Sequence, residues 1–283
     1  MSDARRLESA VENGTRADMR RDGALLGSVS AERIRDELNK MLELAKEPSR
    51  GFIFMHEEGI LARILPELDA TFGEEQNEFH PDDVFMHSLK SCDRARPELH
   101  LRWSALLHDI GKKEMKQIVD GRTVFYRHEE ASARDADVIL ERLRYPRELR
   151  KKVVSLIVHH MFNITDDWSD GAVRRFIVRA GRENLDDLLA LREADGLSRG
   201  DDAVMAQNAA IRRRFERVLA SEAAFKIRDL AIGGADIMEA IGIGEGPEVG
   251  RILRKLFEAV LENPEENTRE RLISLVLKLR EKE

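Results

Sequence analysis

The sequence predicts an all-α fold, a multi-helix bundle. Apolar residues recur with a helical period along nearly the whole 283-residue chain, and convincing strand alternation is missing. Charged residues make up 36% of the chain and aromatic residues only 5%, which is typical of charge-rich helical proteins. The best strand candidate is the short segment 123–126, which follows the turn residues Asp120 and Gly121.

Start and stop signals place two helices in the first part of the chain, over 31–46 and 60–65. Ser30 is a good N-cap for the first of them. Pro48 and Gly51 are expected to break the chain after this helix, because proline and glycine interrupt regular structure. The chain should therefore open as short helices separated by turns.

Three regions follow from the pattern of polar linkers and turns. Residues 1–79 are helical and end in a polar linker, and residues 80–200 hold most of the histidines. Residues 201–283 contain a charged helix over 209–220, and a glycine-rich turn over 242–247 then leads into two amphipathic helices. We expect these three regions to be the domains of the protein.

Composition excludes several classes of protein. The net charge of −7 argues against a general polyanion binder, although local basic patches are compatible with it. A single cysteine, Cys92, excludes a disulfide framework. No apolar run approaches the roughly 18 residues that span a bilayer, and no signal-peptide pattern opens the chain. We therefore expect a cytoplasmic protein without membrane contact.

The most informative motif is His108-Asp109-Ile110-Gly111-Lys112, which follows an apolar run. Adjacent His108 and Asp109 offer a divalent metal two ligands from one place on the backbone. Gly111 is expected to end the helix, and Lys112 is placed to neutralise phosphate charge. The alternative for such a pair is a histidine at a helix C-terminus beside a capping aspartate.

Three further residues of the middle region could join this pair. His87 shares an apolar helix face with Val84, which also suits an ordinary core histidine. His128 opens a predicted helix, where an exposed histidine is the alternative. Asp195 follows Leu191 by four residues on a buried stripe, and a buried carboxylate is costly unless it is paired or bound to a cation.

Helical phase chooses between the neighbours His159 and His160. Val153, Ile157 and His160 fall at i, i+4 and i+7, so they share the inward face. His159 follows Lys152 by seven residues on a more polar face. We therefore predict His160 as a ligand and His159 as a supporting or surface residue.

Taken in order, these residues resemble the HD phosphohydrolase superfamily. The resemblance implies a helical bundle with a central HD domain at 80–200, in which one metal is held by His87, His108, Asp109 and Asp195. It also implies that His128 and His160 extend the site toward a second metal, with Asp109 bridging. Mixed imidazole and carboxylate ligation suits Mn, Fe, Co, Ni or Zn better than Mg. A metal-activated water would then attack phosphorus, while Lys112 and Arg127 stabilise the developing charge.

A closer resemblance covers nearly the whole chain. The segments VSAERIRDELNKML, ILARILPELDATFG and LAIGGADIMEAIGIGEGPEVGRIL occur around the HD block. Their order is similar to that of bacterial tRNA nucleotidyltransferases, the CCA-adding enzymes, and their poly(A) polymerase relatives. This resemblance makes 1–79 neck-like and 201–283 tail-like, with the tail contacting the acceptor region of tRNA. It also implies hydrolysis of 2′,3′-cyclic phosphodiesters, 2′-nucleotides or phosphomonoesters at the HD site.

The chain departs from that family at its start. Family members begin with a nucleotidyltransferase head that holds two Mg ions, whereas LESAVENGTRADMRRD, at residues 7–22, resembles the second neck helix. Pairs of consecutive acids occur, but none lies in a strand context that could rebuild such a site. We therefore expect that this chain does not add CCA by itself.

Three functions follow as alternatives. The first is a metal-dependent phosphatase or 2′,3′-cyclic phosphodiesterase acting on nucleotides or on RNA or tRNA 3′ ends. The second is a non-catalytic tRNA-binding partner, or half of a split tRNA nucleotidyltransferase. The third, a hydrolase of signalling nucleotides such as guanosine tetraphosphate, has no distinguishing motif in its favour. Oligomeric state is left open.

Two basic runs bear on the second alternative. They comprise Arg142, Arg144, Arg147, Arg150, Lys151 and Lys152, and then Arg212, Arg213 and Arg214. Such runs are either solvated helix faces or contacts to a phosphate backbone, and in the second case the tail and these helices would bind tRNA.

Overall fold

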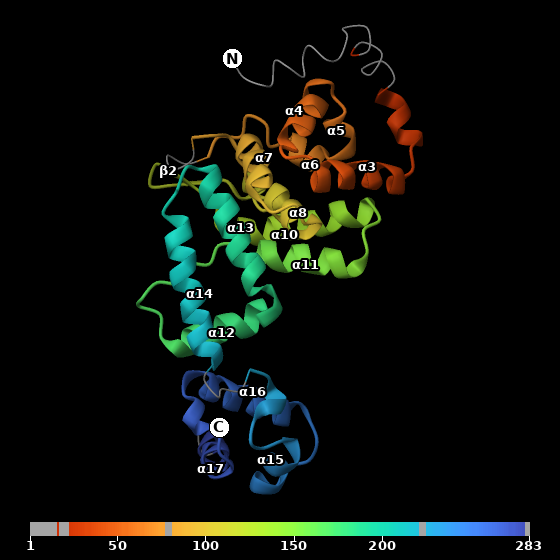
Figure 1. Ribbon diagram of the computed structural model, residues 1–283. Coiled ribbons are helices and arrows are strands. Elements are labelled where there is room, and N and C mark those ends of the chain that lie inside the picture. Colours follow the sequence, from red (N-terminus) through yellow and green to blue (C-terminus); the bar gives the residue numbers. More distant parts are fainter. Residues whose placement is uncertain (1–15, 17–22, 77–80, 221–224, 281–283) are drawn as a thin grey trace. The chain divides into compact units, whose positions relative to one another are not determined.

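The computed structural model describes residues 16, 23–76, 81–220 and 225–280. Within these residues the chain is mostly helical, and the one sheet is a two-stranded hairpin (Figure 1). The all-α prediction is confirmed. None of the helices in this described part is long and apolar enough to cross a membrane. The segment 7–22 that resembles a neck helix lies outside the described residues, except for Arg16.

The elements follow one another through short connections. In chain order they are η1 (Gly23–Ser28), α3 (Ala31–Leu44), α4 (Ser49–Glu57), α5 (Leu61–Ile64), α6 (Pro66–Asp69), α7 (Val84–Arg94), α8 (Leu99–Leu107), α9 (Lys112–Met115), β1 (Gln117–Val119), β2 (Arg122–Val124), α10 (His128–Arg142), α11 (Arg147–His159), α12 (Asp170–Ala180), η2 (Arg182–Asn184), α13 (Leu185–Ser198), α14 (Val204–Ala220), η3 (Ile227–Asp229), α15 (Gly234–Ile241), α16 (Pro247–Glu262), η4 (Pro264–Glu266) and α17 (Arg269–Arg280).

Two compact units divide the chain, and each is made of two segments. The first comprises Met1–Phe162 with Asp186–Asn208, and the second comprises Asn163–Leu185 with Ala209–Glu283. Every candidate ligand falls in the first unit. The division into regions 1–79, 80–200 and 201–283 stays a prediction.

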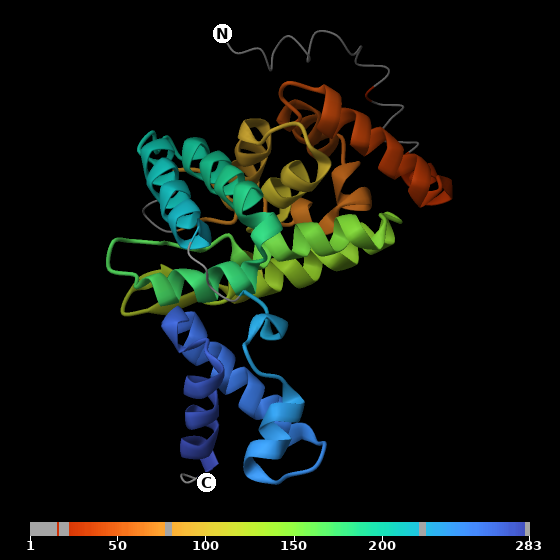
Figure 2. The ribbon, with the colours of Figure 1, turned by 60° about the horizontal axis from the view of Figure 1, so that its bottom comes forward.

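Helix α8 lies at the centre of the first unit, and every residue from Leu101 to Leu107 is buried. Helices α10 and α11 run side by side along the same core (Figure 2). Trp103 donates its indole N–H to the hydroxyl of Tyr145 over 3.0 Å, and that hydroxyl donates to Asn39 on α3. This buried chain of hydrogen bonds ties three parts of the unit together.

A buried arginine, Arg102, donates hydrogen bonds to the backbone carbonyls at the C-terminal end of α3. The guanidinium of Arg102 donates to the carbonyls of Leu42 and Ala45, each over 2.7 Å. Helix ends leave their last carbonyls without partners, and a buried cation needs several acceptors. Arg102 therefore meets both needs, and it fixes α3 against the centre of the unit.

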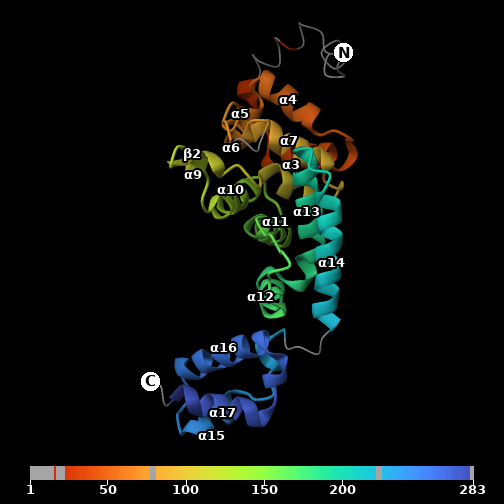
Figure 3. The same cartoon turned by 90° about the vertical axis from the view of Figure 1, so that its left-hand side faces the viewer.

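The second unit has its own core. Helices α15, α16 and α17 pack together around Ile237, Leu256 and Val260 (blue in Figure 3). Helix α12 contacts α16, and the buried Arg174 donates to the carbonyl of Leu261 over 2.7 Å. Gly242, with φ of 66°, ends α15, as expected for the glycine-rich turn.

Gly51 is the first local prediction that the structure corrects. It was expected to break the chain, but it lies inside α4, where a β-carbon would collide with the thioether of Met41. The chain break falls at Pro48 alone. The helix expected over 60–65 is present but shorter, as α5, because Leu65 precedes a proline and leaves the α conformation.

The strand expected at 123–126 is shorter and lies one residue earlier. Strand β2 ends at Val124 and pairs antiparallel with β1, with Val119 opposite Arg122. Between them Asp120 and Gly121 have φ of 50° and 74°, as the two central residues of a type I′ hairpin turn require. The chain after β2 therefore leaves the hairpin and leads into α10.

Candidate metal centre

His87 comes from α7, whose N-terminus is capped by Asp83. The Asp83 carboxylate accepts from the backbone N–H of Met86 over 2.7 Å, so the helix begins one turn before His87. The imidazole of His87 is buried, and its Nδ1 lies 3.1 Å from the hydroxyl of Ser198 on α13. Its other ring nitrogen, Nε2, faces the other candidate ligands.

His108 and Asp109 follow α8 directly. The prediction that Gly111 ends this helix is wrong, because α8 ends at Leu107 and Gly111 has an ordinary φ of −72°. Glycine is needed there for a close approach, since a β-carbon would lie 2.5 Å from the backbone nitrogen of Ser132. The N–H of Gly111 also donates to the Ser132 hydroxyl over 2.9 Å. The turn is thus held directly against α10, which carries His128.

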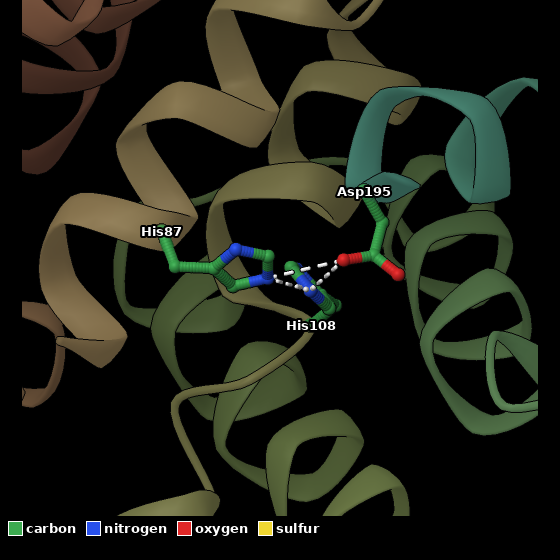
Figure 4. Close-up of side chains that lie close together, drawn as sticks. All are labelled: His87, His108 and Asp195. Carbon is green, nitrogen blue, oxygen red and sulfur yellow. Dashed lines mark hydrogen bonds and ion pairs between the residues drawn. The ribbon is translucent and has the colours of Figure 1, made fainter. Parts of the chain in front are cut away.

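The six predicted ligands converge on one place in the first unit. His87, His108 and Asp195 point toward one another from α7, the end of α8 and α13 (Figure 4). Nε2 of His87 lies 3.2 Å from Nε2 of His108 and 3.1 Å from Oδ1 of Asp195. These three residues, and separately His108, Asp109 and His160, each form a group whose ligand atoms lie within 4.8 Å of one another.

Asp109 joins the two groups through its two oxygens. Its Oδ2 lies 3.4 Å from Nε2 of His87 and 3.3 Å from Nε2 of His108. Its Oδ1 lies 3.1 Å from Nε2 of His128 and 3.8 Å from Nε2 of His160. Each oxygen of the Asp109 carboxylate therefore faces two histidines.

Backbone carbonyls fix the orientation of three of the imidazoles. Nδ1 of His108, His128 and His160 lies 2.7–2.9 Å from a carbonyl oxygen three residues earlier in the chain. A carbonyl can only accept, so Nδ1 carries the proton and Nε2 of the neutral ring is a free lone pair. Metal-binding histidines use the same arrangement to set their tautomer.

Asp109 and His128 consequently face each other as two acceptors. Oδ1 of Asp109 and Nε2 of His128 are buried and have no hydrogen-bond partner within the described residues. Buried lone pairs that are unsatisfied cost free energy, and two of them aimed at one space repel each other. A cation between them would remove both penalties.

The charges of the cluster are strongly coupled. Burial opposes protonation of His108, but the carboxylates of Asp109 and Asp195 outweigh it and raise its pKa to about 10. Burial and the positive charge on His108 lower the pKa of His160 to about 3. Burial would raise the pKa of Asp109, but His108 and Lys112 hold it well below its usual range. The two carboxylates thus favour positive charge beside them.

Lys112 is buried beside the carboxylate of Asp109. Its Nζ lies 2.7 Å from Oδ2 of Asp109 and 2.7 Å from the side-chain oxygen of Gln76. It also lies 5.5 Å from the centre of the Phe125 ring. The predicted phosphate-neutralising lysine is therefore at the cluster, where it already balances one ligand.

A pocket of about 390 Å³ opens onto the cluster, and Arg127 and Arg199 both line it. Arg127 has a left-handed backbone, and its guanidinium is 71% exposed and pairs with Glu130 over 2.5 Å. Arg199 instead pairs with Asp195 over 3.0 Å, and its buried Nε has no hydrogen-bond partner in the part of the chain that the structure describes. The role predicted for Arg127 stays a prediction.

Sequence reasoning missed three side chains that support the cluster: Gln76, Ser198 and Arg199. Ser198 and Arg199 lie three and four residues after Asp195, so helical spacing was the available signal. His159 lies outside both ligand groups, and its Nδ1 contacts the carbonyl of Ser155 over 2.8 Å.

Acidic neighbours accompany most of the first basic run. Arg142 pairs with Glu67, Arg150 pairs with Asp137, and Lys152 pairs with Asp187. In the second run Arg214 pairs with Asp170. These pairs suit solvated helix faces, and contact of either run with RNA stays a prediction.

Two family models match the sequence. The model described as "tRNA nucleotidyltransferase domain 2 putative" matches residues 123–276, and the model described as "Probable RNA and SrmB- binding site of polymerase A" matches residues 10–72. Together they cover segments from both compact units.

Curated relatives agree with these models. The chain is 36% identical over 237 residues to an A-adding tRNA nucleotidyltransferase of Deinococcus radiodurans, covering 81% of this chain and 54% of the relative. It is 34% identical over 239 residues to a CC-adding tRNA nucleotidyltransferase of Thermus thermophilus, and the match covers 82% of this chain and 53% of that relative. A multifunctional CCA protein of Chromobacterium violaceum is 38% identical over 164 residues, which cover 56% of this chain and 40% of that protein. The chain thus spans about half the length of the first two relatives.

Proposed function

The chain belongs to the tRNA nucleotidyltransferase family, and we propose that its histidine and aspartate cluster is a metal-dependent phosphohydrolase site of the HD type. The site would act as a phosphatase or 2′,3′-cyclic phosphodiesterase on nucleotides or on RNA or tRNA 3′ ends. The observation that supports this most is the convergence of four imidazoles on the two oxygens of Asp109. Buried polar groups arranged in this way cost free energy unless they are paired or bound to a cation.

The donor set fits a divalent metal. His87, His108, Asp109 and Asp195 would hold one ion, and His128 and His160 would extend the site toward a second, with Asp109 shared. The unpartnered Oδ1 of Asp109 and Nε2 of His128 support this assignment, because both lone pairs need a positive neighbour. Mixed nitrogen and oxygen ligation suits Mn, Fe, Co, Ni or Zn better than Mg.

The catalytic roles follow from these positions. A bound divalent metal would lower the pKa of a coordinated water and polarise a phosphoryl oxygen. Asp109 would orient the site through both oxygens, and Lys112 would balance charge beside it. Arg127 at the pocket edge and Arg199 beside Asp195 would stabilise charge that develops on phosphate. Helix α8, which leads into His108, is buried from Leu101 to Leu107.

Hydrolysis assays with a panel of divalent metals test this proposal. Purified protein with Mn²⁺ or Ni²⁺ is expected to hydrolyse a generic phosphodiester and adenosine 2′,3′-cyclic phosphate. The Asp109→Ala variant should lose this activity while retaining its helical content. Absence of turnover on both substrates with every metal would refute the proposal.

A second function, binding of tRNA, is supported by the family models and by the activities named for the relatives. It would place the chain beside a nucleotidyltransferase, as an RNA-binding partner or as half of a split enzyme. Arg251 and Arg254 are exposed on α16 in the tail-like region. Changing both to glutamate should weaken tRNA binding and flatten its salt dependence. Binding equal to that of the unaltered protein would remove α16 from this proposal.

A further inference from the structure

The lining of the pocket over the ligand cluster is of two kinds. Buried polar groups form what is called here its floor, and exposed apolar side chains form its mouth. The floor is formed by charged and imidazole groups, including Asp109 and His160. Several apolar side chains also line the pocket, and two of them, Tyr126 and Met161, are largely exposed. They are 60% and 62% exposed, so water covers much of their apolar surface.

Tyr126 is unlike the other tyrosine of the chain. The sequence has two tyrosines, and Tyr145 is buried in the core with its hydroxyl in a hydrogen-bond chain. Tyr126 follows β2 and precedes His128 by two residues, so the end of the hairpin presents it at the pocket. The ring of Tyr126 is thus exposed beside the polar cluster, whereas the ring of Tyr145 packs in the core.

Met161 reaches the same pocket from a second element. It follows His160 directly after α11, and the rings of His160 and His128 lie 5.3 Å apart. Tyr126 lies two residues before His128 and Met161 one residue after His160, so both exposed side chains come from segments that also supply cluster histidines. Exposed apolar side chains at the mouth of a pocket are typical of ligand-binding surfaces.

We propose that Tyr126 and Met161 form a nucleobase-binding subsite, so that the pocket takes a nucleoside phosphate with its phosphate on the cluster and its base at the mouth. This inference rests on the phosphohydrolase function proposed above. The flat ring of tyrosine stacks on any base, and the flexible thioether of methionine adapts to the edge of an aromatic ring. In such a ligand the sugar lies between the phosphate and the base, so the buried cluster and the exposed side chains would take its two ends.

The size of the pocket favours one nucleoside over a strand. A volume of about 390 Å³ lies near the lower end of the roughly 300–1,000 Å³ typical of small-ligand pockets. Tyr126 is the one exposed aromatic ring among the described residues that line it, whereas strand-binding grooves offer successive rings for successive bases. The substrate class that fits is a mononucleotide or the terminal nucleoside of an RNA.

Substrate discrimination tests the subsite. Steady-state kinetics with Mn²⁺ would compare adenosine 2′-phosphate with glycerol 2-phosphate, which has no ring, for the unaltered protein and for Tyr126→Ala. The ratio of kcat/KM for the nucleotide to kcat/KM for glycerol phosphate should fall roughly tenfold in Tyr126→Ala, mainly through KM for the nucleotide. Tyr126→Phe keeps the ring and should retain the ratio. An equal loss on both substrates, or no loss, would overturn the subsite.

A matched control comes from the same hairpin. Ile118 is 77% exposed and does not line the pocket, so Ile118→Ala should leave the ratio unchanged. Equilibrium dialysis of adenosine 2′-phosphate separates the two proposals. Binding that weakens in Tyr126→Ala, without turnover of either substrate, would keep the subsite and reject the hydrolase. Turnover of both substrates without any effect of Tyr126→Ala on nucleotide binding would reject the subsite alone.

Discussion

The ammonium nitrogen of Lys112 lies 2.7 Å from Oδ2 of Asp109, and both side chains are buried. Oδ2 is also the oxygen that faces His87 and His108. The lysine is therefore a fixed positive charge beside a proposed metal ligand, and its second acceptor, Gln76, keeps it there. This relationship has consequences for both metal affinity and turnover.

Lys112→Met should bind Mn²⁺ more tightly and turn over more slowly. Removing the like charge beside the metal should raise affinity about tenfold, whereas loss of a cation that stabilises phosphate should lower kcat about a hundredfold. Calorimetric titration and steady-state kinetics measure the two effects. Lys113→Met is the control, because Lys113 contacts the carbonyl of Ala70 away from the cluster. Normal turnover in Lys112→Met would contradict the assigned role.

His160→Ala and His159→Ala form a matched pair of neighbours. His160 lies 3.8 Å from Oδ1 of Asp109, whereas His159 contacts the carbonyl of Ser155. His160→Ala should weaken Mn²⁺ binding by roughly tenfold or more, because one ligand atom is lost. His159→Ala should bind as the unaltered protein does, as calorimetric titration would show. Equal losses in the two variants would refute the choice made from helical phase.

Gly111→Ala should destabilise the protein by about 1–3 kcal/mol. Its β-carbon would lie 2.5 Å from the nitrogen of Ser132, so α10 must move. Gly250→Ala, by contrast, meets nothing within 4 Å in helix α16 and should stabilise by up to about 1 kcal/mol through better helix propensity. Urea unfolding measures both. A stability for Gly111→Ala equal to that of the unaltered protein would show that the close approach is unimportant.

Asp187→Asn should destabilise the protein in a pH-dependent manner. Burial would raise the pKa of Asp187, but Lys152 and His100 outweigh it and lower the pKa. Because the folded pKa is depressed, the stabilisation is fully present above the unfolded pKa of about 3.9, and it is lost as pH falls through the folded value. Urea midpoints of the two proteins should differ at pH 5, where the carboxylate of Asp187 is charged. The difference should shrink at lower pH, and a pH-independent difference would reject the electrostatic cause.

Local pattern predicted the fold class and the inward placement of several candidate ligands, whose role as ligands stays a prediction. Helical spacing placed His87 and His160 on inward faces, and both side chains are buried. Asp195 was expected on a buried stripe, and α13 brings it to 3.1 Å from His87. Such predictions succeed because the helical period and the burial of apolar side chains are recorded within a few residues of sequence.

Contacts between distant segments could not be predicted in this way. Gly51 reads as a helix breaker, yet it lies inside α4, where its small size leaves room for Met41 from α3. Gly111 reads as a helix stop, but its smallness serves the contact with Ser132. Gln76 reaches Lys112 from a loop that nothing in the local pattern connects with the site. In each case the partner lies in another element, so only the folded chain shows the reason.

Hydrolysis of adenosine 2′,3′-cyclic phosphate after metal removal and controlled return of Mn²⁺ tests the central claim most directly. The stripped protein should be inactive, and activity should return in proportion to bound metal. Asp195→Asn should need more Mn²⁺ for the same return, because one carboxylate charge is lost while the side-chain shape is kept. Hydrolysis that persists in the stripped protein, or a metal response in Asp195→Asn identical to that of the unaltered protein, would contradict a catalytic metal at this cluster.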